Sequence, residues 1–168
     1  MHEQLLLRLP HRQFVWTFPK ILRPFFRHDR RLFSEISRLL FKMPADFYNE
    51  AAGKAIESAA VIAFQTAGDF VRFNPHYHGI VLEGGLDDQG RFVYVPIGDL
   101  SRMSEYFRRV IIKFFLEKQL INEKLSQNLL SWGHSGFSID NQVKITAFGQ
   151  KARESLSQYI AKPPVSLK

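Results

Sequence analysis

Two histidines, His76 and His78, are separated by a single tyrosine in the apolar stretch FVRFNPHYHGIVLEGG. In a β-strand, successive side chains alternate between the two faces, so both imidazoles would point one way and Tyr77 the other. Two imidazoles on one face can bind the same metal ion. The alternative is a strand with two half-exposed histidines that bind nothing, and the spacing alone fits both interpretations equally well.

Residues upstream of the histidine pair can complete a metal site. Gln65 and Asp69 lie on or near the preceding predicted strand, and either can supply an oxygen ligand. A mixed nitrogen and oxygen site suits Mg²⁺ or Mn²⁺, with open positions for phosphate oxygens. The chain has no cysteine, which excludes disulfides and thiolate zinc sites. The pattern therefore favours Mg²⁺ or Mn²⁺ over a closed structural zinc site.

A tyrosine near the end of the chain is followed three residues later by a lysine. The segment SLSQYIAKPPVSL places Tyr159 and Lys162 on one face of a helix predicted to begin at about Gln150. A phenol with a pKa of about 10 is a poor nucleophile near neutral pH. It becomes effective when a metal polarises the phosphate under attack and a cation stabilises the developing charge. Taken alone, however, the spacing more often reflects a buried tyrosine beside a solvated lysine.

The net charge of +7 is unevenly distributed. Residues 1–54 carry ten Lys or Arg against five Asp or Glu, residues 101–168 carry eleven against five, and residues 55–100 carry two against six. Basic flanks suit a polyanion such as DNA or RNA, although solvated helix faces explain them equally well. The candidate phosphate contacts are Arg23, Arg27, Arg30 and Arg31, interleaved with Phe25 and Phe26. The candidates for stacking on bases, with packing at a strand end as the alternative, are Trp132, His134 and Phe137.

The predicted elements that hold these residues are a mixture of strands and helices. Aromatic and β-branched residues predict strands at 13–18, 60–66, 77–83 and 91–97. Apolar spacing predicts one helix over 30–43, with Asp29 as its N-cap, a short helix after Pro44, and another helix over 101–124. Turn residues predict hairpins across GGLDDQG, which joins the last two strands, and at Asp140–Asn141. The mixture indicates an α+β fold with helices packed on an antiparallel sheet.

Length and composition fit one globular domain. The chain has 168 residues, is 45% hydrophobic and contains 16 phenylalanines, which predicts an aromatic-rich core. The apolar run near the N-terminus is too short for a signal peptide, and no segment approaches the length of a membrane span. We therefore expect a soluble, cytoplasmic protein without a membrane partner.

Four stretches in the same order resemble the HUH-type (His-hydrophobic-His) transposases of bacterial insertion sequences, which move by a rolling-circle-like, single-stranded route. These stretches are HRQFVWTFPKILRPFF, NPHYHGIVLEGG, WGHSGFSI and YIAKPPVSL, and the resemblance extends over nearly the whole chain. It implies an RRM-like antiparallel sheet that carries the histidines, with the tyrosine on a helix that faces them. It also implies a partner, single-stranded DNA at the element ends and at the target.

The resemblance further implies a role for each candidate residue. His76 and His78 are the metal ligands, and Asp69, seven residues before His76, matches the spacing of the acidic third ligand in related replication initiators. Tyr159 is the nucleophile that forms a 5′-phosphotyrosine link to the cleaved strand. Lys162 matches the lysine of the Tyr-x-x-Lys pattern in those initiators. The expected activity is metal-dependent DNA nicking and strand transfer.

The chain departs from the family's pattern at both ends and at the nucleophile. Members usually begin with a cysteine-rich zinc-binding domain and continue beyond the proline pair, and this chain has neither region. Better-known members use two tyrosines a helical turn apart, whereas Ser155 and Pro163 stand four residues from Tyr159. We therefore expect residues 1–168 to form a single catalytic domain, truncated at both ends relative to the family. The alternatives are an inactive nucleic-acid-binding remnant of such a transposase and a nickase of the replication initiator or relaxase type.

Overall fold

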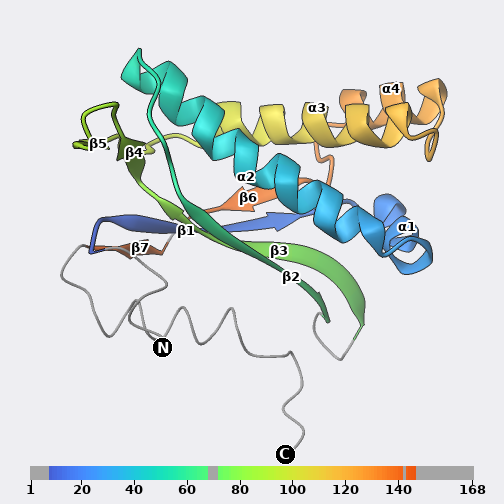
Figure 1. Ribbon diagram of the computed structural model, residues 1–168. Coiled ribbons are helices and arrows are strands. Elements are labelled where there is room, and N and C mark those ends of the chain that lie inside the picture. Colours follow the sequence, from blue (N-terminus) through green and yellow to red (C-terminus); the bar gives the residue numbers. More distant parts are fainter. Residues whose placement is uncertain (1–7, 68–71, 142, 147–168) are drawn as a thin grey trace, which may run out of the picture.

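Helices cover one face of an antiparallel sheet in the computed structural model of the chain, which describes residues 8–67, 72–141 and 143–146 (Figure 1). The predicted α+β class is confirmed. The closing helix predicted from about residue 150 lies outside the described residues. Within the described ranges, no helix is both long enough and apolar enough to cross a membrane.

The large sheet contains β3, the strand with the two histidines, as an inner strand. Its strands are β1 (His11–Thr17), β2 (Ala60–Ala67), β3 (Phe73–Leu82), β6 (Ser138–Asp140) and β7 (Lys144–Ile145). They lie in the order β2-β3-β1-β6, each antiparallel to its neighbours, and β7 also pairs with β1. The three strands predicted at 13–18, 60–66 and 77–83 are confirmed, and the last of them begins four residues earlier than predicted.

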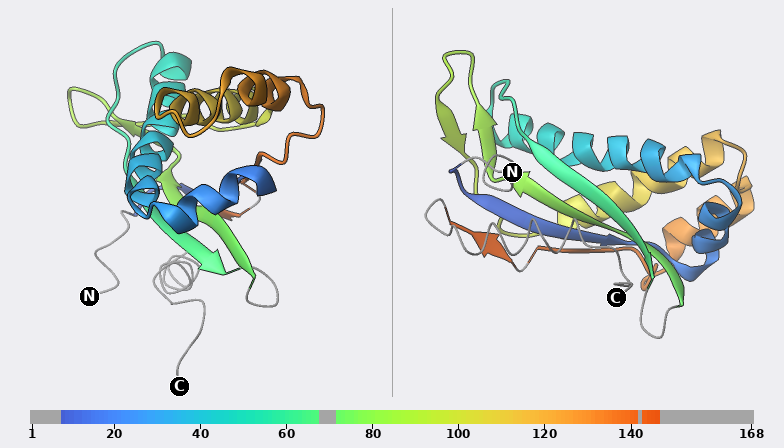
Figure 2. Two further views of the ribbon diagram at one scale, coloured as in Figure 1. Left: turned by 90° about the vertical axis from the view of Figure 1, so that its right-hand side faces the viewer. Right: turned by 60° about the horizontal axis from the view of Figure 1, so that its bottom comes forward.

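The helices form a second layer above this sheet. The long helices are α2 (Arg31–Ala52) and α3 (Ser101–Glu117), and α4 (Glu123–Ser131) packs against α3 (Figure 1). A 3₁₀ helix, η2 (Lys20–Leu22), leads into the short helix α1 (Arg23–His28), which lies beside the end of the sheet where β3 begins (Figure 2). This arrangement leaves the other face of the sheet without a helix from the described residues.

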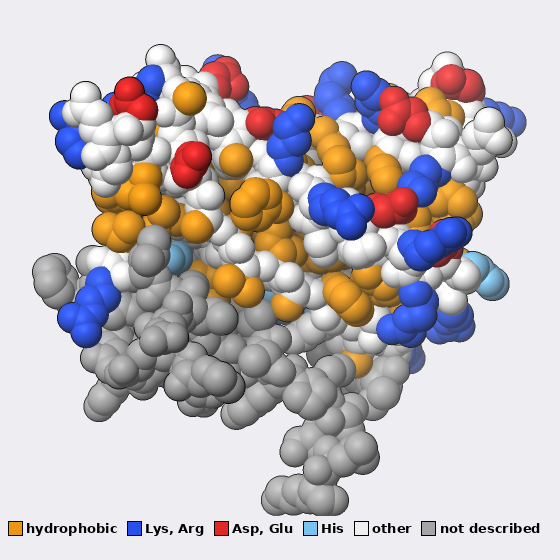
Figure 3. All heavy atoms as spheres, in the orientation of Figure 1, with side chains coloured by type: hydrophobic (Ala, Val, Ile, Leu, Met, Phe, Trp, Pro, Cys, Tyr) orange, Lys and Arg blue, Asp and Glu red, His pale blue; other side chains and the backbone are white. Residues whose placement is uncertain are grey.

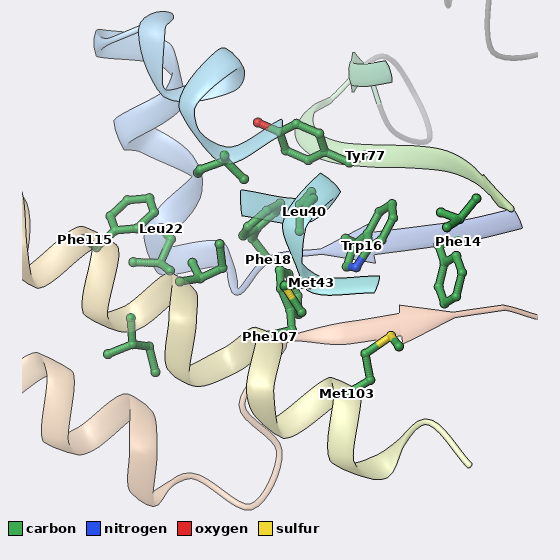
Figure 4. Packing of buried hydrophobic residues seen from close by; sticks show 14 of the residues in the cluster. Phe14, Trp16, Phe18, Leu22, Leu40, Met43, Tyr77, Met103, Phe107 and Phe115 are labelled. Atoms are coloured by element: carbon green, nitrogen blue, oxygen red, sulfur yellow. The ribbon is translucent and has the colours of Figure 1, made fainter. Parts of the chain in front are cut away.

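Aromatic side chains fill the space between the two layers. Phe14, Trp16 and Phe18 point from β1 and its end toward the helices, and Tyr77 does so from β3 (Figure 4). All four are fully buried, and Phe18 contacts the ring of Phe107 on α3 at a centroid distance of 5.4 Å. The predicted aromatic core is confirmed, and it occupies the face of the sheet opposite to His76 and His78.

Helix α2 continues through Pro44, where the sequence predicted a break. A proline inside a helix removes one backbone hydrogen bond and costs about 3 kcal/mol. The apolar stripe nevertheless extends past it, because Met43 and Tyr48 are both buried. Burying two such side chains contributes about 1.5–3 kcal/mol each, which outweighs the local cost. The N-terminal prediction is close to the structure, since the Asp29 carboxylate accepts a hydrogen bond from the backbone N–H of Arg31 at 3.0 Å.

The single helix predicted over 101–124 is wrong, because the chain forms two helices there. α3 ends at Glu117, and the chain turns at Gln119, whose φ of 58° lies in the left-handed region. α4 then begins after Asn122, whose side chain accepts a hydrogen bond from the backbone N–H of Leu125 at 2.9 Å. Asparagine is a strong N-cap residue, so the sequence carried a signal for this second helix start.

Both predicted hairpins are wrong in their strand partners. β4 (Gly84–Leu86) pairs with β5 (Phe92–Tyr94) in a separate two-stranded sheet, whereas β3 pairs with β1 and β2. β6 and β7 both pair with β1 and not with each other. The segment between them stays at this edge, because the backbone N–H of Gln13 bonds to the carbonyl of Val143 at 2.9 Å. β1 is seven residues long and therefore offers room for both short strands in succession.

Candidate active site

The two histidines lie side by side on the face of β3 that points away from the helices. Their ring centroids are 4.9 Å apart, with an angle of 72° between the ring planes. Tyr77, between them in sequence, points to the opposite face and into the core. The predicted alternation is therefore confirmed. Because a metal–nitrogen bond is about 2 Å long, two rings this close can supply ligands to one ion.

The ring of His76 is oriented by the backbone. Its Nδ1 is 2.7 Å from the carbonyl oxygen of Asn74, which can only accept a hydrogen bond. Nδ1 must therefore carry the proton, and the lone pair of a neutral ring lies on Nε2. A metal-ligating histidine usually donates a hydrogen bond of this type from the ring nitrogen that does not bind the metal, and this bond fixes both the tautomer and the ring orientation.

His78 lies deeper than His76, with 4% of its surface exposed. Burial, and to a smaller extent the neighbouring His76, lower the pKa of its imidazole to about 4. The ring is therefore uncharged at neutral pH. An uncharged imidazole has the lone pair that a metal ion needs, so the environment of His78 suits a ligand.

His76 belongs to a row of polar side chains that crosses four strands. Gln65 on β2 and Thr17 on β1 are its direct cross-strand partners, and Ser138 on β6 is the partner of Thr17. Directly opposite residues of antiparallel strands project from the same face. The hydroxyl groups of Thr17 and Ser138 are 2.6 Å apart, within hydrogen-bonding distance. We call Gln65, His76, Thr17 and Ser138 the polar row.

The polar row contains residues that the sequence reasoning missed. It identified Gln65 as a neighbour of the histidines but attached no role to Thr17 or Ser138. These two are polar residues at strand ends, which is common, and their sequence separation from His76 is large. One signal was present, since Thr17 and Ser138 each lie in one of the four resemblance stretches.

The donor set in the described residues fits part of a divalent cation site. His76 and His78 offer two imidazole nitrogens, and Gln65 offers an amide oxygen beside His76. Among the described residues, no group of three or more His, Cys, Asp or Glu side chains is arranged to hold a metal ion. The candidate ligand Asp69, the candidate nucleophile Tyr159 and its neighbour Lys162 lie outside the described residues.

The four predicted phosphate-contacting arginines separate into two groups. Arg23 and Arg27 lie on α1, where Arg27 stacks over the ring of Phe73 at 4.7 Å. Arg23 donates from Nε to the carbonyl of Phe18 at 3.1 Å, and its burial lowers the pKa of the guanidinium. The other two arginines, at the start of α2, are engaged locally: Arg30 stacks over Phe33, and Arg31 pairs with Asp29 at 3.0 Å.

Trp132 and His134, the predicted base-stacking residues, are both exposed in the loop between α4 and β6. Trp132 is 42% exposed, which is high for so large an apolar side chain. Phe137, by contrast, packs against the rings of Phe18 and Phe107. For Phe137 the packing alternative is therefore correct, whereas the other two side chains are accessible to a ligand.

Comparison with known proteins identifies a family for this chain. Residues 59–168 match the family model described as "Putative transposase", which is more than half of the chain. The chain belongs to this transposase family. It is also similar to the transposase for insertion sequence element IS801 of Pseudomonas savastanoi pv. phaseolicola, with 28% identity over 94% of the chain. The chain spans 40% of that relative's length. No solved structure shows significant similarity to the chain.

Proposed function

We propose that the chain is the catalytic domain of an HUH-type transposase that nicks and rejoins single-stranded DNA in a metal-dependent reaction. Membership of the transposase family supports a DNA-cutting and strand-transfer function. The single observation that carries the HUH assignment is the placement of His76 and His78 on one face of an inner strand, with His76 Nδ1 held by the Asn74 carbonyl.

The topology supports an RRM-like core. The elements β1, α2, β2, β3, α3 and β6 follow one another in the chain, and their strands lie in the order β2-β3-β1-β6. This is a β-α-β-β-α-β arrangement with the helices on one face. In such a fold the other face of the sheet is available for nucleic acid, and here that face carries the histidines.

In the proposed site, His76 and His78 hold Mg²⁺ or Mn²⁺ together with an oxygen from Asp69 or Gln65. The bound cation would withdraw charge from the scissile phosphate and stabilise the charge that develops on it. The phenolic oxygen of Tyr159 forms a bond to phosphorus, and the bond from phosphorus to the 3′ oxygen breaks. The tyrosine proton is lost to solvent, and the departing oxygen becomes a 3′-hydroxyl group. Lys162 is proposed to stabilise the phenolate.

The positions of the other tyrosines support Tyr159 as the nucleophile. The chain has five tyrosines, and the structure buries Tyr48 and Tyr77 completely. Tyr106 is exposed but lies on α3, on the helix side of the sheet. Tyr94 is exposed as well, but its hydroxyl bonds to Glu83, seven strand residues from His76 and so roughly 20 Å away.

The test is formation of a covalent protein–DNA adduct. Wild-type chain is incubated with labelled single-stranded element ends and Mn²⁺, denatured and separated by electrophoresis. Tyr159→Phe should remove the adduct, whereas Tyr94→Phe, which alters an exposed tyrosine hydrogen-bonded to Lys144, should leave it. An adduct that survives Tyr159→Phe would contradict the assignment, and its loss in Tyr94→Phe would identify Tyr94 instead. If wild type binds the DNA but forms no adduct on any element end, the chain is the inactive remnant.

The role of the histidines has its own measurement. His76→Ala and His78→Ala should each weaken Mn²⁺ binding in a calorimetric titration and abolish the adduct. The matched control for Mn²⁺ binding is His134→Ala, which changes an exposed histidine in the loop before β6. Unchanged Mn²⁺ binding in both β3 variants would show that the histidine pair holds no metal.

A further inference from the structure

A cavity of about 580 Å³ lies at the end of the sheet, between η2, α1 and the start of β3. Its lining combines two segments that are distant in sequence, residues 20–28 and residues 72–74, and Figure 2 shows α1 beside this end of the sheet. We call it the α1 pocket. The residues on which the argument depends are Lys20, Arg23, Arg27, Arg72, Phe73 and Asn74.

The α1 pocket is strongly basic. Among the described residues that line it, four are Lys or Arg and none is Asp or Glu. Figure 3 shows Lys and Arg side chains gathered at the end of the molecule where α1 lies. None of these four cations pairs with a carboxylate of the described residues, in contrast to Arg31 with Asp29 and Lys118 with Glu35. An open pocket of unpaired cations attracts an anion with several oxygens.

One residue of the α1 pocket also contacts the histidine pair. Asn74 is among the lining residues of the pocket, and its backbone carbonyl holds Nδ1 of His76. Two residues of a β-strand span about 7 Å, which is close to the distance between adjacent phosphates of a single DNA strand. DNA with one phosphate at the histidines can therefore place its next phosphate at the pocket.

Two features of the pocket suit a nucleotide rather than an isolated phosphate. The guanidinium of Arg27 lies over the ring of Phe73, 4.7 Å from its centroid, and both groups have planar faces that can stack with a base. The side-chain oxygen of Asn74 is buried and has no hydrogen-bond partner within the described chain. An unsatisfied amide can pair with the edge of a base or with a sugar hydroxyl. The volume is also within the usual range for small-molecule sites.

We propose that the α1 pocket binds the nucleotide next to the scissile phosphate in the DNA strand. Lys20, Arg27 and Arg72 contact its phosphate, and its base lies against the stacked pair of Arg27 and Phe73. The pocket thereby fixes the register of the strand on the sheet, so that the neighbouring phosphate lies at His76. The position of the DNA relative to His76 rests on the proposed function. Binding of DNA by the pocket does not require that the chain cleaves it.

The experiment is a salt titration of DNA binding by fluorescence anisotropy, with labelled oligodeoxythymidine as the probe. The test variant is Arg27→Gln/Arg72→Gln. The matched control is Arg38→Gln/Lys42→Gln, which removes two exposed cations from one face of α2. We expect the test variant to bind at least about tenfold more weakly, and its salt slope to fall by about 0.7 for each lost phosphate contact. Circular dichroism and Mn²⁺ binding should match wild type.

Each outcome decides the proposal. Equal affinity in the test and control variants would overturn it, as would wild-type chain that does not bind the probe. A test variant that has lost its fold is replaced by Lys20→Gln, a single exposed substitution with the same expected direction. Thymidine monophosphate and inorganic phosphate serve as competitors. If either displaces the probe at concentrations similar to the probe's own, the pocket binds small phosphates and the DNA assignment is wrong. If the wild-type chain binds DNA but forms no covalent adduct, the proposed cleavage activity is refuted and the proposed DNA binding by the pocket is not.

Discussion

The hydroxyl group of Tyr77 donates a hydrogen bond to the carbonyl oxygen of Phe33, 3.0 Å away in the buried layer between sheet and helices. Tyr77 stands between the two histidines in sequence and points away from them. The bond therefore attaches the histidine strand to α2 at the point where the candidate site lies. A site that must hold two rings in a fixed relation benefits from such a rigid support.

Removing this hydrogen bond should weaken the fold without breaking it. Tyr77→Phe deletes only the hydroxyl group, and the Phe33 carbonyl keeps a hydrogen bond from Ser37. We expect the free energy of unfolding to fall by about 0.5–1.5 kcal/mol, measured by urea denaturation. The control is Tyr106→Phe, at a tyrosine that is 44% exposed, and it should change stability less. An equal or larger loss in the control would show that the Tyr77 bond contributes nothing specific.

The close contact between Trp16 and Gly79 leads to a second prediction. A Cβ atom at position 79 would lie 2.6 Å from the Trp16 ring, which is buried and held against Phe14. Gly79→Ala should therefore destabilise the chain by about 1–3 kcal/mol, because the indole must move in a packed core. Thermal unfolding can measure this, with Gly98→Ala as a control, since a Cβ there meets nothing within 4 Å. Equal melting temperatures for the two variants would contradict the contact.

Individual strands could be predicted from the sequence, because the alternation of side chains that indicates a strand lies within a few consecutive residues. The alternation around His76-Tyr77-His78 correctly indicated a strand with both imidazoles on one face. The strand partners were predicted poorly, because pairing depends on the whole sheet. Glycines and aspartates in 84–90 indicated a turn correctly, but the strand before that turn is β4 and not β3. Nothing in the local sequence distinguishes these two outcomes.

In the candidate site, too, some residues could be predicted from local spacing and others depend on how the strands pair. The histidine pair and Gln65 could be found from spacing, since Gln65 lies on the neighbouring strand. Thr17 and Ser138 could not, because their place beside His76 depends on the register of β1 with β3 and β6. The α1 pocket could not be predicted from the sequence either, because its residues Arg27 and Arg72 are distant in sequence and are brought together only by the fold. The cluster of arginines was recognised, but its split into two groups depends on packing.

A buried carboxylate at the other end of β3 should matter for stability. Glu83 is fully buried, and its oxygens contact the cationic groups of Arg12 and Lys144. Glu83→Gln keeps the shape but leaves both cations without their counter-charge. We expect a loss of about 2–3 kcal/mol in urea denaturation, at the lower end for a buried pair because Lys144 is partly exposed. The exposed Glu57 offers the control Glu57→Gln. If Glu83→Gln lowers the free energy of unfolding by less than Glu57→Gln does, the contacts of Glu83 with Arg12 and Lys144 are not needed for stability.

The stability of the protein should depend on pH in the acid range through Asp87, which lies between β4 and β5. Hydrogen bonds from the Arg91 backbone, and then from the Lys54 and Arg91 side chains, lower the pKa of this carboxyl well below its usual 3.8. A lowered folded-state pKa gives stability that is complete above the unfolded value and is lost as the pH falls below it. The difference in urea midpoint between wild type and Asp87→Asn should therefore be constant above about pH 5 and shrink below 3.8. Asp88→Asn, at an exposed neighbour, should show no such trend.

The oxygen ligand of the proposed metal site leads to the last prediction. Gln65 lies directly opposite His76, and side chains in such a pair have Cβ atoms about 5 Å apart. Gln65→Ala removes the amide oxygen and should weaken Mn²⁺ binding at least about tenfold. Gln65→Glu puts a carboxylate oxygen at the same place and should bind Mn²⁺ at least as tightly as wild type, because hard cations prefer charged oxygen. Both can be measured by calorimetric titration at neutral pH.

The control for this titration is Thr66→Ala, on the same strand but the opposite face. A general loss of β2 structure would weaken Mn²⁺ binding in the control as well, whereas loss of a ligand would not. Asp69→Ala identifies the competing source of oxygen. If Gln65→Ala binds Mn²⁺ like wild type while Asp69→Ala does not, the oxygen comes from Asp69 and the position opposite His76 serves another purpose. If both variants bind normally, two imidazoles suffice to hold the ion, and phosphate oxygens of the DNA complete its coordination.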